Sequence, residues 1–194
     1  MDRWVILFYE LLFPAMWFAF FVYWWVMARN TKATQRVESA AFKVTRNILL
    51  FASVALVFFN GIPVPWLYQR LYGYPLASFW LGAAVTAAGL GFAVWARVHL
   101  GRNWSSQVTI KEGHELVRTG PYGLVRHPIY TGILTGMVGS AIAIGQVRGL
   151  VAVALMLASF WMKIRLEERW MRETFGVQYD DYAHRVRALV PFVL

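Results

Sequence analysis

The chain has 194 residues, of which 59% are hydrophobic, 17% aromatic and only 15% charged, with a formal net charge of +9. This composition is too apolar for an ordinary soluble domain and indicates an integral membrane protein, organised as one domain over residues 1–194. The basic balance fits topogenic charges that meet anionic headgroups and argues against nucleic-acid binding, and the absence of cysteine excludes disulfides, thiolate catalysis and cysteine-ligated metals.

Three apolar stretches in the N-terminal half predict three membrane spans, since about 20 apolar residues cross a bilayer. They run over residues 4–28, 47–67 and 76–98. A glycine and two prolines within residues 61–65 predict a kink or a break in the second span. This part of the chain, residues 1–98, carries no motif that points to chemistry.

Two further apolar stretches, over residues 129–144 and 150–164, predict a tight helical hairpin. Together with the first three spans they predict an all-α integral membrane protein of five transmembrane helices. Residues 99–194 then form the catalytic region, which consists of a polar loop, the hairpin and C-terminal helices. Within the loop, short strands are expected over residues 107–110 and 115–117.

The distribution of basic residues predicts the orientation in the membrane. All but three of the 19 Lys and Arg residues fall on one side of the predicted spans, and the exceptions are Arg3, Arg70 and Arg148. The positive-inside rule therefore places the N-terminus outside and the C-terminus in the cytoplasm. The polar tail then lies on the cytoplasmic side, where the last span is expected to continue as a helix and a second short helix near residues 179–187 to lie against the membrane.

The most informative motif is a polar run at the start of the fourth span, which reads Gly-Pro-Tyr-Gly-Leu-Val-Arg-His-Pro-Ile-Tyr-Thr-Gly over residues 120–132. A second polar cluster, Arg-Leu-Glu-Glu-Arg over residues 165–169, follows the fifth span. Polar groups at the membrane edge of a span suggest a site, and the hairpin brings both clusters to the same end. The plainer interpretations are topogenic charges and carboxylates paired with basic neighbours within one helical turn.

Two other patterns have simpler explanations. Small residues spaced four apart in the fourth span, Gly132, Gly136 and Ser140, predict close helix packing. The histidines at positions 99, 114, 127 and 184 lack the spacing of a zinc motif, so no metal site is expected.

At these residues the chain resembles the isoprenylcysteine carboxyl methyltransferase family, as a short prokaryotic integral-membrane member. The family signature reads G-P-Y-x-x-V-R-H-P-x-Y-x-G, then E-E-x-x-L, then F-G-x-x-Y-x-x-Y and a closing proline. The chain matches these motifs in order at residues 120–132, 167–171 and 175–182 and at Pro191. The departure is Met171 in place of leucine, which is a tolerated apolar exchange.

The resemblance implies S-adenosyl-L-methionine as the methyl donor, with S-adenosyl-L-homocysteine as its product, held in a cytoplasmic pocket over the last hairpin and the tail. It also implies a lipophilic substrate that enters sideways from the bilayer. The residues implied to bind the donor or to shape its pocket are His114, Leu116, Gly120, Pro121, Tyr122, Val125, Arg126, His127, Pro128, Tyr130, Glu167 and Glu168, with Tyr179, Tyr182 and Pro191 closing the pocket.

The expected reaction is methyl transfer to a carboxylate, which is already ionised at neutral pH and requires alignment and exclusion of water rather than a base. Arg126 or Arg165 is the candidate cation for the substrate carboxylate, because a guanidinium binds it through two hydrogen bonds. Glu167 is expected to bind the amino or ribose groups of the donor, and Tyr130 or Trp170 to face its sulfonium. The expected catalytic residues are Arg126, Arg165, Glu167 and Glu168.

Other functions remain open at this stage. A phospholipid amine N-methyltransferase has similar clusters and would need a base, for which Glu168 or His127 is the candidate. A sterol-reductase-like oxidoreductase is similar in its C-terminal region but would use NADPH, and the paired glutamates favour the methyltransferase. A channel or transporter would need polar groups near mid-span, where this chain is mostly apolar. Prenylated protein, a free isoprenoid thioether acid and other lipid acids all fit as the acceptor.

Overall fold

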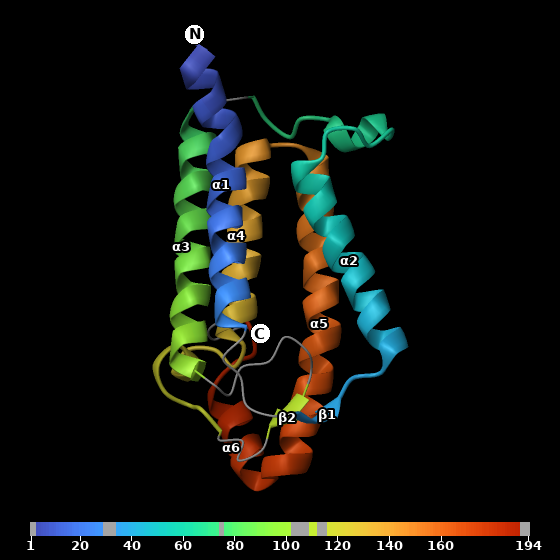
Figure 1. Cartoon of the computed structure of the whole chain (residues 1–194), viewed down its shortest axis with the longest axis vertical. Helices are drawn as coiled ribbons and strands as arrows, with labels where there is room; N and C mark the ends of the chain where they lie inside the picture. The colour runs from blue at the N-terminus through green and yellow to red at the C-terminus, as the bar shows by residue number, and fades with distance from the viewer. Residues whose placement is uncertain (1–2, 29–33, 74–75, 102–108, 112–115, 191–194) are drawn as a thin grey trace.

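The computed structural model describes residues 3–28, 34–73, 76–101, 109–111 and 116–190, most of which are helical. The α-helices are α1 (Arg3–Met27), α2 (Ala40–Phe58), α3 (Leu76–Leu100), α4 (Pro128–Ile144), α5 (Val147–Phe175) and α6 (Val177–Arg185). Helices α1 to α5 run side by side along the long axis of the molecule, and α6 lies at one end, close to the C-terminal segment (Figure 1). The predicted helical membrane architecture is therefore confirmed.

Four helices among the described residues, α1, α2, α3 and α5, are long and apolar enough to cross a membrane. Helix α4 is apolar but has only 17 residues, fewer than the roughly 20 that a crossing takes. Its length is set by Pro128 at its first position and by Gly145, whose φ of 61° is left-handed and ends the helix. The prediction of five spans is thus supported for four of them.

The predicted second span was wrong at both ends. Helix α2 begins at Ala40 because Ser39 accepts a hydrogen bond from the backbone N–H of Phe42 (3.4 Å) and so caps the helix. It ends at Phe58, before the glycine and the two prolines, and Pro65–Tyr68 form a separate turn of 3₁₀ helix. The early start was missed because hydropathy carries no information about a helix cap. The break predicted at the prolines is confirmed.

The core lies between all five long helices. Its buried side chains include Trp17, Leu56, Leu90, Met137 and Met156, one from each of α1 to α5. Two polar side chains inside this core, Trp17 and Ser140, are hydrogen-bonded within the protein. The Trp17 indole N–H donates to Ser140 Oγ (3.0 Å), and that hydroxyl donates to the carbonyl of Gly136 (3.0 Å).

Helices α3 and α4 pack backbone against backbone. A Cβ atom added at Gly89 would lie 2.5 Å from the Gly136 nitrogen, and one added at Gly132 would lie 2.5 Å from the Gly89 oxygen. A Cβ atom added at Gly82 or at Gly139 would likewise lie 2.5 Å from a backbone atom of the facing helix. The close packing predicted from the small-residue spacing of the fourth span is confirmed.

The α4–α5 turn is tied to the α2–α3 connection at the end of the bundle where the N-terminus lies (Figure 1). Arg148 donates to the side-chain oxygen of Gln146 (2.6 Å) and to the carbonyl of Phe59 (3.2 Å), and its guanidinium lies 5.1 Å from the ring centroid of Tyr68. Arg148 therefore binds groups of the protein itself and connects the turn between α4 and α5 to the segment between α2 and α3.

The opposite end carries a small antiparallel sheet of β1 (Thr34–Val37) and β2 (Thr109–Lys111), together with α6 (Figure 1). Strand β2 overlaps the strand predicted over residues 107–110. The strand predicted over residues 115–117 was wrong, since Leu116 and Val117 are irregular and residue 115 lies outside the described residues. Helix α5 does continue beyond its apolar part, and a second short helix, α6, follows it.

Candidate functional site

The backbone before α4 pairs with the segment that follows α6. The N–H of Arg126 donates to the carbonyl of Arg187 (2.7 Å), and the N–H of His127 donates to that of Ala188 (3.0 Å). The Thr131 hydroxyl adds a hydrogen bond to the carbonyl of Leu189 (2.7 Å). The start of α4 is thereby held rigidly by a chain segment that is remote in sequence.

A turn of 3₁₀ helix over Gly120–Gly123 leads into this paired segment. Gly120 has a left-handed φ of 58°, and a Cβ there would lie 2.7 Å from the imidazole of His99. The same imidazole stacks on the ring of Tyr122 at a centroid distance of 6.4 Å. The Tyr182 hydroxyl donates to the carbonyl of Tyr122 (2.6 Å) and so connects α6 to the turn. Glycine is required here for both its conformation and its lack of a side chain.

Arg126 links three elements through its guanidinium. Its Nε and Nη2 donate to Oε1 of Glu168 on α5 at 2.9 and 2.5 Å. Its Nη1 donates to the carbonyls of Ala183 (3.1 Å) and Val186 (2.5 Å) at the end of α6. Arg172, one turn further along α5, lies 3.5 Å from the other oxygen of Glu168. This carboxylate is therefore surrounded by cations.

His127 lies between the two glutamates. Its Nε2 is 3.3 Å from Oε1 of Glu168, and its Nδ1 is 3.5 Å from Oε2 of Glu167. Burial alone would lower the pKa of His127, but the hydrogen bonds and negative charges of both carboxylates outweigh it and raise the pKa above its ordinary value. The two carboxylates therefore stabilise the imidazolium form of His127, which bridges Glu167 and Glu168.

Glu167 is held by a second group of side chains. The Tyr130 hydroxyl donates to its Oε1 (2.7 Å), and the Tyr130 ring stacks on His127 at a centroid distance of 5.6 Å and an interplanar angle of 13°. The ammonium of Lys163 lies 3.9 Å from the same oxygen and 5.3 Å from the Tyr130 ring centroid. The Glu167 side chain is still 23% exposed, which leaves it reachable by a ligand.

Lys163 contacts this cluster, although the sequence indicates it only as a basic neighbour of the glutamates and not as a candidate site residue. It is buried, although lysine is seldom buried without a function or a partner. The available signal was its position one helical turn before Glu167, where an i, i+4 pair meets on one helix face.

A buried ion pair at the start of α2 was also missed. Arg46 donates to Glu38 at 2.8 Å, and the Glu38 side chain has no exposed surface. The backbone carbonyl of Arg46 accepts a hydrogen bond from Ser159 on α5 (3.0 Å), one turn before Lys163. No local pattern connects Glu38 with α5, because their proximity arises from packing between distant helices.

The structure brings together most of the predicted site residues but not all of them. Arg126, His127, Tyr130, Glu167 and Glu168 form the cluster just described. Pro121, Tyr122, Val125, Pro128, Tyr179 and Tyr182 are buried in the packing around it, whereas Leu116 and Gly120 are partly or fully exposed. His114 and Pro191 lie outside the described residues.

Arg165 is not part of this cluster. Its side chain is exposed, and its guanidinium lies 5.3 Å from the ring centroid of Trp161 on the same helix. It stands two positions from Glu167, and residues two apart on a helix do not face the same way. The geometry therefore does not support Arg165 as a partner of the carboxylate cluster.

The three tyrosines near the cluster favour their protonated form. Burial raises the pKa of Tyr122 and that of Tyr179 well above their usual range, and the charge of Glu167 or Glu168 adds to the effect. Burial likewise raises the pKa of Tyr182 to about 12. Of these hydroxyls, that of Tyr182 donates a hydrogen bond, to the carbonyl of Tyr122.

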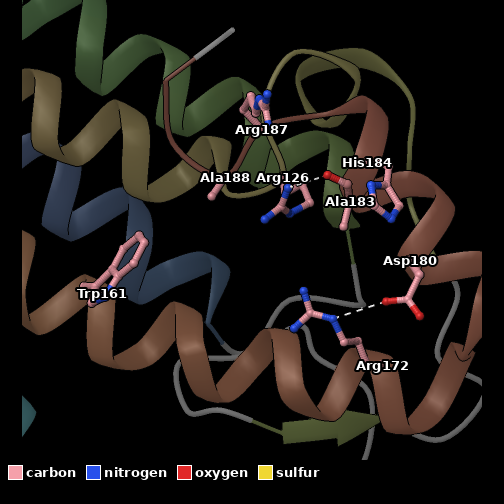
Figure 2. Close-up of a pocket in the computed structure, with 8 residues that line it drawn as sticks. All are labelled: Arg126, Trp161, Arg172, Asp180, Ala183, His184, Arg187 and Ala188. Carbon is pink, nitrogen blue, oxygen red and sulfur yellow. Dashed lines mark hydrogen bonds and ion pairs between the residues drawn. The ribbon is translucent and has the colours of Figure 1, made fainter. Parts of the chain in front are cut away.

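A cavity of about 350 Å³ adjoins the cluster between α5 and the α6 end of the chain (Figure 2). Trp161 and Arg172 line it from α5, and Asp180, Ala183 and His184 line it from α6. The remaining lining residues are Arg126, Arg187 and Ala188. It shares Arg126 with the cluster but contains neither Glu167 nor Tyr130.

The chain is thus a helical membrane protein in which two adjacent glutamates face an arginine, a histidine and a tyrosine at one end of the bundle. The family model described as phospholipid methyltransferase matches residues 77–178, and the chain belongs to this family. The predicted resemblance to the isoprenylcysteine methyltransferases is confirmed by the relatives.

A probable protein-S-isoprenylcysteine O-methyltransferase of Oryza sativa subsp. indica is 28% identical over 87% of this chain and 88% of its own length. The nickel-cobalt-cadmium resistance protein NccN of Alcaligenes xylosoxydans xylosoxydans is 32% identical over 58% of this chain and 52% of its own. The structure of a eukaryotic intramembrane Ras methyltransferase, isoprenylcysteine carboxyl methyltransferase, is similar with a TM-score of 0.51 and 26% identity. That match covers 79% of this chain and 52% of the solved chain, so the present chain spans about half of that protein.

Proposed function

We propose that this protein transfers a methyl group from S-adenosyl-L-methionine to the carboxylate of a lipophilic, isoprenylcysteine-like substrate at the cytoplasmic face of the membrane. The observation that carries the proposal is the meeting of Glu167 and Glu168 with Arg126, His127 and Tyr130 at one end of an apolar bundle. The isoprenylcysteine methyltransferases among the relatives support the same reaction.

The residues of the cluster suit the proposed donor. S-adenosyl-L-methionine carries a sulfonium and an ammonium group, which carboxylates and aromatic faces attract. Glu167 offers a carboxylate that is 23% exposed, and the Tyr130 ring already lies near a cation, the Lys163 ammonium. When bound, the donor supplies an electrophilic methyl group on positively charged sulfur.

The residues of this chain have three tasks in the proposed reaction. Glu167 binds and orients the donor's amino or ribose groups. Lys163 holds the substrate carboxylate, because it is a buried cation that lies beside Glu167 and the Tyr130 ring, at 3.9 Å from the Glu167 Oε1 and 5.3 Å from the ring centroid. Burial of the cluster excludes water, which otherwise weakens both interactions.

The geometry favours a carboxylate acceptor over an amine. An amine acceptor would need a base, and both ring nitrogens of His127 already face carboxylate oxygens, Nε2 that of Glu168 at 3.3 Å and Nδ1 that of Glu167 at 3.5 Å. Glu168 faces Arg126, His127 and Arg172 and is equally unsuited to accept a proton. The description of the family as phospholipid methyltransferases keeps the amine reaction as the alternative.

The test is a methyl-transfer assay on the detergent-purified protein, with N-acetyl-S-farnesylcysteine and phosphatidylethanolamine as competing acceptors. We expect transfer to the farnesylated acid and saturable binding of S-adenosyl-L-homocysteine by calorimetry. Glu167→Gln should lose both, whereas Glu173→Gln, an exposed change on the same helix, should retain both. Methylation of the phospholipid amine alone would replace the proposal with the N-methyltransferase.

A further inference from the structure

The cavity beside the cluster joins an apolar wall to a cationic end. Figure 2 shows Trp161 and Arg172 rising from α5 on one side, Arg126 and Ala188 on the other, and residues of α6 at the far end. Trp161 and the two alanines supply the apolar surface, and arginines supply the charge. Such a cavity suits an amphipathic molecule with an anionic group.

The charge of the cavity is only partly balanced. Its lining holds Arg126, Arg172 and Arg187 against a single carboxylate, Asp180, which pairs with Arg172 at 3.2 Å. Within the described part of the chain, the guanidinium of Arg187 has no carboxylate partner. An anion that enters the cavity therefore meets a net positive surface with one guanidinium available for a new ion pair.

The position of the cavity along α5 matches the level of lipid headgroups. From the start of α5 at Val147, about 20 residues cross the hydrocarbon layer. Trp161 falls within that length, whereas Arg172 falls beyond it, about 16 Å further along the helix axis at 1.5 Å per residue. Trp161 is 39% exposed, so an acyl chain can reach it from the side.

We propose that this cavity binds the phosphate group of an anionic membrane lipid, with Arg172 and Arg187 contacting the phosphate and the lipid's glycerol and proximal acyl chain lying against Trp161. The site lies next to the donor and acceptor positions of the proposed reaction, and Arg126 belongs both to its lining and to the cluster. It adjoins them through Glu168, which Arg126 and Arg172 both approach. A phosphate on Arg172 competes with Glu168 for that guanidinium and thereby couples lipid binding to the cluster.

The experiment measures lipid binding directly by native mass spectrometry of the full-length protein in micelles. Phosphatidylglycerol is titrated beside phosphatidylcholine, and glycerol phosphate and inorganic phosphate serve as soluble sources of the same anion. We expect the protein to retain phosphatidylglycerol preferentially and Arg187→Gln to weaken this binding about tenfold, the scale of one charge-assisted hydrogen bond. Trp161→Ala should weaken binding of the lipid but not of glycerol phosphate.

Arg185→Gln is the matched control, because Arg185 is two positions away, 75% exposed in its side chain and paired with Asp181 rather than lining the cavity. Equal retention of both lipids, or equal losses in the Arg187 and Arg185 variants, would overturn the proposal. Inorganic phosphate binding as tightly as the lipid would exclude a lipid site. Competitive displacement of the lipid by S-adenosyl-L-homocysteine would assign the cavity to the donor instead.

Discussion

Arg126 and Glu168 are 42 positions apart in sequence, yet Nε and Nη2 of the arginine both donate to the same carboxylate oxygen, at 2.9 and 2.5 Å. The remaining guanidinium nitrogen donates to the carbonyls of Ala183 and Val186. One side chain thereby joins the start of α4, the polar part of α5 and the end of α6. The planar fork of arginine is what allows these contacts to form together.

Arg126→Lys is expected to destabilise the protein although it keeps the charge. A lysine ammonium cannot reproduce contacts to Glu168 and to two carbonyls in one plane. We expect the free energy of unfolding in mixed micelles to fall by about 3 kcal/mol, the lower end of the cost of breaking a buried ion pair, since His127 still faces Glu168. Arg185→Lys, at an exposed pair, should change it by less than about 0.5 kcal/mol. Similar losses in both variants would argue against the linking role.

The histidine between the glutamates predicts a pH dependence. The pKa of His127 is raised in the folded protein above its ordinary 6.5, so its contribution to stability is complete below that value and is lost as pH rises through the folded-state pKa. The stability difference between the wild type and His127→Gln, followed by denaturation at several pH values, should therefore shrink as pH rises. His184→Gln, on the exposed face of α6, provides the comparison. A difference that grows with pH would contradict the imidazolium bridge.

Lys163 predicts a separation between donor binding and acceptor use. Lys163→Met removes the cation proposed to hold the substrate carboxylate, and we expect kcat/KM for the farnesylated acid to fall by about 100-fold, the value of a charge-assisted contact. Binding of S-adenosyl-L-homocysteine, measured by calorimetry, should stay within a few-fold. Lys163→Arg should recover part of the activity. Loss of donor binding in the methionine variant would move Lys163 to the donor side of the site.

The contact between α3 and α4 predicts a contrast between two glycines on the same helix. Gly89→Ala places a Cβ 2.5 Å from the Gly136 nitrogen, so we expect a loss of about 2 kcal/mol in unfolding free energy from overpacking. Gly91→Ala has nothing within 4 Å of its new Cβ and should be neutral or slightly stabilising, because alanine favours the helix. Unfolding of both variants in the same micelles gives the comparison. Tolerance of Ala at position 89 would show that the helices can separate without cost.

The sequence predicted the existence of α1, α2, α3 and α5 because each contains an apolar run of bilayer length. The exceptions have local causes. Ser39 starts α2 earlier than hydropathy indicates, since a cap is a hydrogen bond rather than an apolar pattern. Helix α4 is short because Pro128 and Gly145 fix its two ends.

The candidate site was predictable where its residues belong to motifs, as at Arg126, His127, Glu167 and Glu168. The Arg46–Glu38 pair was not, because it gains meaning only when α2 packs on α5, whereas the spacing of Lys163 and Glu167 on one helix was a usable signal. Arg165 was a reasonable expectation from charge alone, but helix periodicity turns it toward Trp161.

The pairing of the α4 start with the segment after α6 also sets an order of assembly. The hydroxyl of Thr131 and the carbonyl of Leu189 are separated by 58 positions, and the amides of Arg126 and His127 depend on equally late partners. Synthesis proceeds at roughly 5–20 residues per second. Until α5 has been inserted and α6 has folded, these donors have no protein partner and remain hydrated at the membrane edge. The apolar bundle can therefore form first, and the start of α4 is fixed only after the segment that follows α6 has reached it.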